Sequence, residues 1–474
     1  MQDFPDGLPL PRRYWAVATI GLAIFMAVMD SAIANVALPT IARDLKTDAA
    51  FSIWIVNGYQ LAIAISLLPL SSLGEIVGYR RVYMGGLILF TVASLMCAMS
   101  GSFPMLAIGR ALQGFGAAGV MSVNTALVRY TWPHRRLGRG IGVNAMVVAV
   151  AAAAGPTIAA GILSVAHWPW LFAVNVPFGL AALGIGRFAL PHSPLGRRRF
   201  DYGSALLSAG TLGLLIMSVD ALGHGEAGWV FAGELLTVAG LGTMLVRRQL
   251  ALHSPLLPVD LLKQPIIALS VGTSICSFLA QMLGLVSLPF LLQIRMGFTA
   301  VETGLLMTPW PIATGFAAPL AGRLADRYPA GLLGGIGLVL FAGGFIALAL
   351  MPAHPAAGDV AWRMALCGFG FGIFQSPNNR AMVGNAPRER AGGAAGMLGT
   401  ARLLGQTMGA ALVALLFGRV SGAPEAAALY LAAGIALLGA GVSSLRLLEL
   451  PNVTSPSRVE AREGIRGRNE TGEL

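Results

Sequence analysis

The amino-acid sequence predicts an all-α polytopic membrane protein with about fourteen transmembrane helices. Of the 474 residues, 56% are hydrophobic and only 11% are charged, whereas an ordinary soluble domain is about 25% charged. The apolar residues form continuous helix-length runs, unlike the alternating segments of about ten residues that build membrane β-barrels. The basic residues gather in alternate loops, as expected of a chain that crosses a membrane repeatedly.

The expected spans are apolar runs separated by charged or Pro/Gly-rich loops. The first run is too long for the apolar part of a signal peptide, so we expect it to remain as a span. The spans are predicted near residues 14–38, 51–70, 82–100, 104–128, 140–163, 168–190, 203–222, 228–246, 266–290, 303–322, 331–351, 361–383, 393–417 and 426–446.

The distribution of charge predicts the topology. With the N-terminus placed in the cytoplasm, most of the 32 lysines and arginines fall in cytoplasmic loops. This asymmetry predicts that both termini are cytoplasmic and that the span number is even. We expect a multi-pass protein of the cell (inner) membrane. The two arginines that lie inside expected spans away from the span ends are Arg110 and Arg402. The outer segments hold Arg43, Lys46, Arg295, Arg363 and Arg419.

Composition also argues against several functions. The net charge of +11 fits loops next to anionic lipid better than a nucleic-acid surface, since no basic stripe interleaved with aromatics is present. The cysteines Cys97, Cys276 and Cys367 fall in apolar runs and predict neither disulfides nor a metal site. We expect neither enzyme activity nor a cofactor, and no Gly-rich phosphate loop occurs. Any transport would be driven by a gradient such as that of protons.

A weak internal repeat predicts two halves. Leu73–Arg81 follows the second span and Gly322–Tyr328 follows the tenth, each with an acid followed by arginine, and repeated halves are typical of secondary transporters. The predicted divisions are a cytoplasmic N-terminus at 1–13, a six-helix bundle at 14–190, a basic linker with an inserted helix pair and a loop at 191–265, a second six-helix bundle at 266–447, and a cytoplasmic tail at 448–474 that we expect to be disordered.

Asp30 is the first candidate functional residue. At 1.5 Å per residue it lies roughly 24 Å along the first span from Tyr14, inside a hydrocarbon core of about 30 Å. A carboxylate there costs several kcal/mol unless it is solvated, paired or protonated. Ala27, Ala34 and Ala37 share its helix face, so we expect room there for water or a ligand. We therefore predict that Asp30 binds a proton, with Arg110 as the basic residue that tunes it.

Three other groups of residues have competing interpretations. Arg110 either faces a partner acid or snorkels to the outer interface. Glu75, Arg80 and Arg81, with Asp326 in the repeat, form either a conformational latch at cytoplasmic helix ends or ordinary solvated loops. Gly155 and Pro156 either bend a helix that moves or simply allow close packing.

A substrate cavity lined by residues within the spans is expected. Its candidates are polar or aromatic residues within spans, each of which is as readily explained by a helix–helix hydrogen bond or by aromatic packing. They are Asn35, Tyr59, Gln281, Trp310, Gln375 and Asn378.

Several of these motifs together resemble the major facilitator superfamily, and in particular its fourteen-span drug–proton antiporters. The resemblance covers Tyr14 to Leu447, with Ser71 and Ala160 where glycine is usual and Glu75 where aspartate is usual. The segments that carry it are Met29–Pro39, Glu75–Arg81, Arg110–Gly114, Gly155–Pro156, His167–Gly179, and Gly392–Gly396 with Arg402–Gly405.

The resemblance implies a major facilitator fold of two six-helix bundles plus an inserted pair. It also implies export of hydrophobic or cationic drugs in exchange for protons by alternating access. The implied partners are the lipid bilayer, small amphiphilic substrates and protons, and a periplasmic adaptor with an outer-membrane channel remains open. Two alternatives stand beside this function: an exporter specific for one endogenous metabolite or antibiotic, and a membrane receptor or assembly subunit that transports nothing.

Overall fold

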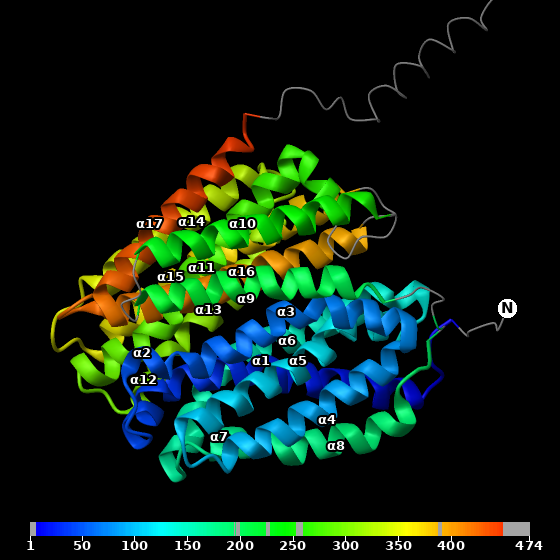
Figure 1. Ribbon diagram of the computed structural model, residues 1–474, viewed down its shortest axis with the longest axis horizontal. Coiled ribbons are helices and arrows are strands. Elements are labelled where there is room, and N and C mark those ends of the chain that lie inside the picture. The colour runs from blue at the N-terminus through cyan, green and yellow to red at the C-terminus, as the bar shows by residue number, and fades with distance from the viewer. Residues whose placement is uncertain are drawn as a thin grey trace, which may run out of the picture.

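The structure is a computed structural model that describes residues 6–193, 195, 200–223, 228–252, 259–386 and 391–448. These residues form helices joined by short loops (Figure 1). Residues 196–199 of the expected basic linker and the expected tail from 449 onward lie outside the described residues, as do residues 1–5.

The N-terminal half of the molecule, defined here as α1 to α8, is held together by close helix crossings. A Cβ on Gly86 of α4 would lie 2.7 Å from the Cα of Gly119 on α5, so only glycine permits this approach. In addition, α1 packs on α6 and α8, and α3 packs on α5. The elements are α1 (Arg12–Asp44), α2 (Ala49–Ser52), α3 (Trp54–Val77), α4 (Tyr79–Ala98), α5 (Phe103–Thr131), η1 (His134–Arg136), α6 (Leu137–Val165), α7 (Trp170–Ala173) and α8 (Asn175–Ala189).

The C-terminal half, defined here as α11 to α17, repeats this kind of packing. A Cβ on Gly337 of α14 would lie 2.7 Å from the carbonyl oxygen of Gly370 on α15. The elements are α11 (Pro265–Phe290), the π-helical η3 (Leu291–Arg295), α12 (Ala300–Met307), α13 (Pro309–Leu324), α14 (Ala330–Ala349), α15 (Ala357–Gly384), α16 (Ala391–Arg419) and α17 (Pro424–Leu445).

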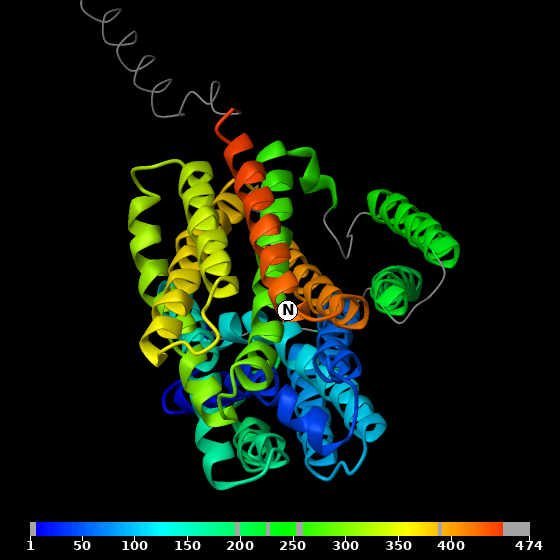
Figure 2. The same ribbon diagram turned by 90° about the vertical axis from the view of Figure 1, so that its left-hand side faces the viewer.

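An additional helix pair, α9 (Tyr202–Gly223) and α10 (Gly228–Ala251), is followed by η2 (Val259–Lys263). Figure 2 shows the pair standing beside the main body. Only α9 packs on both halves, through α3 and α16, while α10 packs mainly on α9. Asp201, just before α9, accepts hydrogen bonds from the backbone and hydroxyl of Ser204 and a 2.8 Å bond from Arg248 of α10, which ties the pair together.

All fourteen predicted spans coincide with helices, but the helices are not equally apolar. Within the described residues, twelve helices are long and apolar enough to cross a membrane. The two other predicted spans, 303–322 and 361–383, correspond to α12 with α13 and to α15. The first is divided at Thr308, just before Pro309. The second carries a polar stretch, Gln375–Arg380, that lowers its mean hydropathy.

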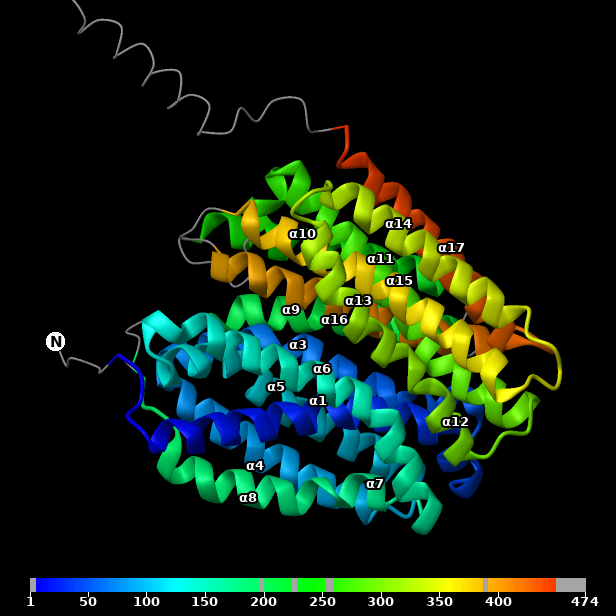
Figure 3. The same cartoon turned by 180° about the vertical axis from the view of Figure 1, so that it is seen from behind.

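The two halves meet at the end of the molecule that holds the C-terminal ends of α1 and α6 (Figure 3). Gln293 donates a 2.8 Å hydrogen bond to the carbonyl of Val36, and the hydroxyls of Thr157 and Thr308 lie 2.8 Å apart. The buried apolar cluster at this end includes residues of α1 and α6 together with residues of α11 and α12. This end of the boundary between the halves is therefore closed.

Candidate functional site

The candidate site lies inside the N-terminal half, around Asp30 of α1. Its carboxylate forms an ion pair with the guanidinium of Arg110 on α5, and both side chains are at most 1% exposed. Arg110 also donates a 2.9 Å bond from Nε to the carbonyl of Ile55 on α3. Burying two opposite charges is tolerated when they are paired and hydrogen-bonded, so the local arrangement of three helices depends on this contact.

Two uncharged amides complete the environment of the Asp30 carboxylate. Gln113 of α5 and Asn175 of α8 donate hydrogen bonds of 2.9 and 2.8 Å to its Oδ1. Gln113 also donates to the hydroxyl of Ser94 on α4 and accepts a 2.6 Å bond from Arg110. The Asp30 carboxylate therefore connects α1 with α5 and α8, and Gln113 extends the network to α4.

Aromatic rings cover the guanidinium of Arg110. Its Cζ lies 4.2 Å from the ring centroid of Tyr59 and 5.5 Å from that of Phe172, both in cation–π range. The Tyr59 hydroxyl donates a 2.8 Å bond to the carbonyl of Ala27, one turn before Asp30. Among the described residues, no acceptor reaches the buried Nη2 of Arg110. One nitrogen of the cation is thus available for a new partner.

The structure differs from one expectation about this site. The alanines of α1 were expected to leave open space beside Asp30, but Asp30 is enclosed by Arg110, Gln113 and Asn175. The sequence did not single out the two amides as site residues. Gln113 and Asn175 lie within the motifs Arg110–Gly114 and His167–Gly179, and a polar side chain in an apolar run was the signal available.

The expected latch residues lie at helix ends. Arg80, at the start of α4, contacts the ring of His192 and donates to the carbonyl of Arg187, and Arg81 donates to the carbonyl of Val77. Glu75 is exposed near the end of α3.

In the C-terminal half, Asp326 forms a 2.5 Å ion pair with Arg380 of α15, and both side chains are more than 60% exposed.

Gly155 and Pro156 lie where α6 meets α1 and α12. A Cβ on Gly155 would lie 2.5 Å from the Cβ of Ala32, and a Cβ on Gly304 would lie 2.5 Å from the carbonyl of Pro156. The glycine and the proline therefore take part in the closed end of the boundary between the halves.

The structure does not bring the six expected cavity residues together. Tyr59 belongs to the Arg110 site. The ring of Trp310 is buried against Phe341 and Phe345 in the core of the C-terminal half, so its role here is packing and not the lining of a cavity. Asn378 is buried too, donating to Ser274.

The three other cavity candidates are spread over three helices. Asn35 of α1 is buried, and its Oδ1 has no partner among the described residues. Gln281 of α11 and Gln375 of α15 are partly exposed.

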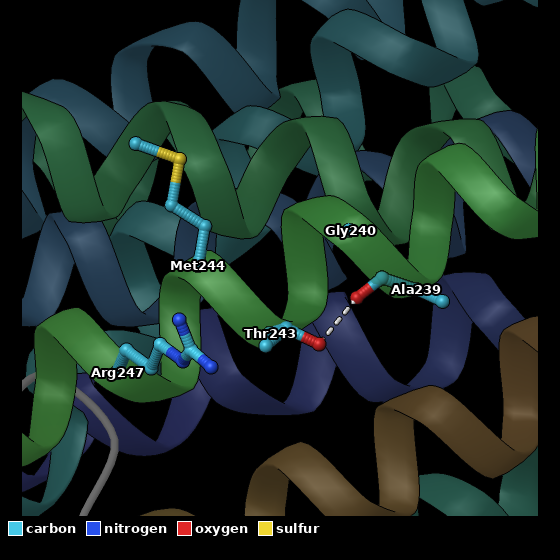
Figure 4. Close-up of a pocket in the computed structure, with 5 residues that line it drawn as sticks. All are labelled: Ala239, Gly240, Thr243, Met244 and Arg247. Carbon is cyan, nitrogen blue, oxygen red and sulfur yellow. Dashed lines mark hydrogen bonds between the residues drawn. The ribbon is translucent and has the colours of Figure 1, made fainter.

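A separate pocket occurs on the surface of α10 and is lined by residues of that helix alone (Figure 4): Ala239, Gly240, Thr243, Met244 and Arg247. The Thr243 hydroxyl donates a 2.7 Å bond to the carbonyl of Ala239, within the same helix. This pocket contains none of the site residues discussed above. The described residues also contain no cluster of His, Cys, Asp or Glu suited to a metal ion.

With twelve helices among the described residues long and apolar enough to cross a membrane, the architecture is that of a multi-pass α-helical membrane protein. The sequence profile of the Major Facilitator Superfamily matches residues 20–410, and the chain belongs to that superfamily. It is therefore a multi-pass membrane protein and a transporter.

Comparison with known proteins supports this assignment. The chain is 55% identical over 446 residues to the uncharacterized transporter YebQ of Escherichia coli K12, covering 94% of this chain and 98% of the relative. It is 31% identical to the methyl viologen resistance protein SmvA of Salmonella typhimurium LT2, covering 86% and 83%. A crystal structure of a POT family transporter with a bound peptide conjugate has a TM-score of 0.69, with 14% identity over 93% of this chain and 96% of that one, and so shares the fold.

Proposed function

We propose that this protein is a proton-coupled antiporter that exports hydrophobic, drug-like organic compounds by alternating access. The observation that carries the proposal is the fully buried ion pair between Asp30 and Arg110. Support comes also from the relative named for methyl viologen resistance. We further propose that the protein crosses the inner membrane fourteen times with both termini in the cytoplasm. The proton gradient would supply the energy for transport, and no cofactor would be needed.

The proposed coupling follows from what protonation would do to the Asp30 site. A proton on Asp30 removes the negative charge that neutralises Arg110, and an unpaired guanidinium in a dry interior is costly. Arg110 would then need another acceptor. Hydrogen bonds that join α1 to α5 and α8 end on this carboxylate, so proton binding would change how α1 is held against these helices. Since α1 also contacts α11, that change would reach the boundary between the halves.

The proposed cycle uses the closed end described above. When α1 and α6 separate from α11 and α12, substrate would leave and a proton would enter. An inward proton is favourable, since one charge moving across 100 mV supplies about 2.3 kcal/mol. We place Glu75, Arg80, Arg81 and Asp326 at the opposite end as the groups whose contacts change when that end opens or closes.

The experiment is a substrate profile in inside-out vesicles from a strain that lacks its own efflux pumps. A panel of fluorescent amphiphiles with positive, negative and no net charge is added with and without a proton gradient. The proposal predicts gradient-dependent uptake of several chemically unrelated compounds, together with proton release from the vesicles when each of them is added. Uptake that is the same after the gradient is collapsed would refute proton coupling. Transport of a single compound would support the specific exporter instead.

A further inference from the structure

Arg402 of α16 lies at the boundary between the two halves. One turn before it, Gly399 faces α3: a Cβ built on this glycine would lie 3.9 Å from the side chain of Leu67. Three residues after it, a Cβ built on Gly405 would lie 2.6 Å from the carbonyl oxygen of Ile275 on α11, so the two helices are in close contact there. Because successive helical residues rotate by about 100°, Arg402 projects between α3 of the N-terminal half and α11 of the C-terminal half.

The depth of Arg402 makes its charge expensive. It is separated from the first residue of α16, Ala391, by about 16 Å and from the last, Arg419, by about 26 Å, at 1.5 Å per residue. Arginine this far inside a membrane helix is rare and faces a partner or a polar passage. Its side chain is partly exposed at the boundary.

No described residue compensates this charge. The Nε of Arg402 is buried without a hydrogen-bond partner, and its guanidinium takes part in no ion pair with a described residue. Asp30, the carboxylate deep in the N-terminal half, is already engaged by Arg110. The other described acids of the two halves lie in loops or near helix ends; they are Asp6, Asp44, Asp48, Glu75, Glu302, Asp326, Asp359 and Glu425.

Arg446 shows how this protein holds a buried arginine whose role is structural. It donates to the hydroxyl of Ser270 on α11 at 3.1 Å, to Asn378 of α15 at 2.9 Å and to Ser443 of α17 at 2.5 Å, so three helices supply its acceptors. Within the part of the chain that the structure describes, Arg402 has no such set of acceptors. A structural role is therefore a poor explanation for it.

We infer that Arg402 is a substrate-recognition residue, which pairs with an acidic group of an amphiphilic substrate such as a carboxylate, sulfonate or phenolate. The inference rests on the proposed transport function and narrows its substrate class. A guanidinium binds a planar carboxylate through two charge-assisted hydrogen bonds, which would satisfy the unpaired Nε and offset the charge. Among the described residues of the two halves, the one carboxylate deep inside the helices is that of Asp30, and its charge is neutralised by Arg110, so a cationic substrate would lack a counterpart there.

The test compares two dyes that share a xanthene core and differ in charge, fluorescein (anionic) and rhodamine 123 (cationic). Equilibrium binding to the purified full-length protein is measured by fluorescence anisotropy without a proton gradient. The variants are Arg402→Gln, which removes the charge, and Arg402→Lys, which keeps it. Arg247→Gln, on the exposed face of α10, is the matched control that removes one cation elsewhere.

We expect fluorescein to bind the wild type, to bind Arg402→Gln at least about tenfold more weakly, and to bind Arg402→Lys and Arg247→Gln within about threefold of the wild type. Rhodamine 123 should bind Arg402→Gln at least as well as the wild type. Equal fluorescein affinity in the wild type and Arg402→Gln would overturn the inference, as would tighter binding of rhodamine 123 than of fluorescein to the wild type. The binding measurement uses no proton gradient, so it tests the role of Arg402 separately from proton coupling. If vesicles showed no proton-driven transport, the proposed function would be wrong, but the dye-binding result would still stand.

Discussion

The carboxylate of Asp30 and the guanidinium of Arg110, eighty positions apart in the chain, form an ion pair in the interior of the N-terminal half. Each charge is buried only because the other is present. The pair joins α1 to α5, and the amide of Asn175 adds α8. A change in the protonation of one residue therefore acts on the packing of three helices.

Removing one charge of the Asp30–Arg110 pair should lower the free energy of unfolding more than removing both charges. We expect Arg110→Gln to lower the free energy of unfolding by about 3–5 kcal/mol, because Asp30 is left as an uncompensated buried charge. The double variant Asp30→Asn with Arg110→Gln should recover at least half of that loss. Unfolding in mixed detergent, followed by circular dichroism, measures both. Additive losses in the double variant would show that the two charges are not coupled.

Gly304 should be required for the closed end between α6 and α12. A side chain at this position would meet the carbonyl of Pro156 at 2.5 Å, and such overpacking costs about 1–3 kcal/mol. We expect Gly304→Val to separate the helices, seen as a longer distance between spin labels at Ser164 and Leu305. Gly315→Val is the matched control, since nothing lies within 4 Å of that position. An unchanged distance in Gly304→Val would contradict the closed arrangement.

The ion pair between Asp201 and Arg248 should make the inserted helix pair sensitive to acid. Partial burial raises the pKa of the Asp201 carboxyl, but hydrogen bonds from Arg248 and Ser204 outweigh this and lower its pKa from the ordinary 3.8 to about 2. Stability from this group is therefore full above about pH 4 and is lost as the pH falls toward 2.

We expect Asp201→Asn to lower the thermal unfolding midpoint at pH 6 and to have almost no effect near pH 2. At pH 6 the free energy of unfolding of Asp201→Asn should be lower than that of the wild type by about 1 kcal/mol or less. The effect is small because the two side chains of the pair are 21% and 45% exposed and water screens their charges. Thermal scans at both pH values check this. If the gap between the midpoints of the wild type and Asp201→Asn grew as the pH fell, the pKa of Asp201 could not be lowered in the folded protein, and the prediction would be wrong.

The exposed pair Asp326–Arg380 should matter for transport more than for stability. Surface ion pairs contribute about 0.2–1 kcal/mol, so Asp326→Asn should leave unfolding nearly unchanged. If the pair is a latch, the same variant should change the transport rate, and the charge-swapped double variant Asp326→Arg with Arg380→Asp should restore it. The latch hypothesis fails if transport by Asp326→Asn equals that of the wild type.

The helices could be predicted from the sequence because each span must bury about twenty apolar residues. The break at Thr308, before Pro309, was not anticipated, although proline at the start of a helix is a recognised signal.

Asp30 and Arg110 stood out because charges are costly in lipid, and the structure places them together. Gln113 and Asn175 did not stand out, since a buried amide can bond to any neighbouring helix and the choice depends on packing. For Trp310 the sequence left cavity lining and aromatic packing open, and the structure places its ring in a core.

The most direct test of the account measures two activities of the protein in proteoliposomes: uptake driven by a proton gradient, and exchange of labelled for unlabelled substrate without a gradient. We predict that Asp30→Asn loses gradient-driven uptake and keeps exchange. Glu234→Gln, which changes a carboxylate on α10 away from the site, should keep both. Gradient-driven uptake by Asp30→Asn at the wild-type rate would contradict the claim that Asp30 couples proton entry to export.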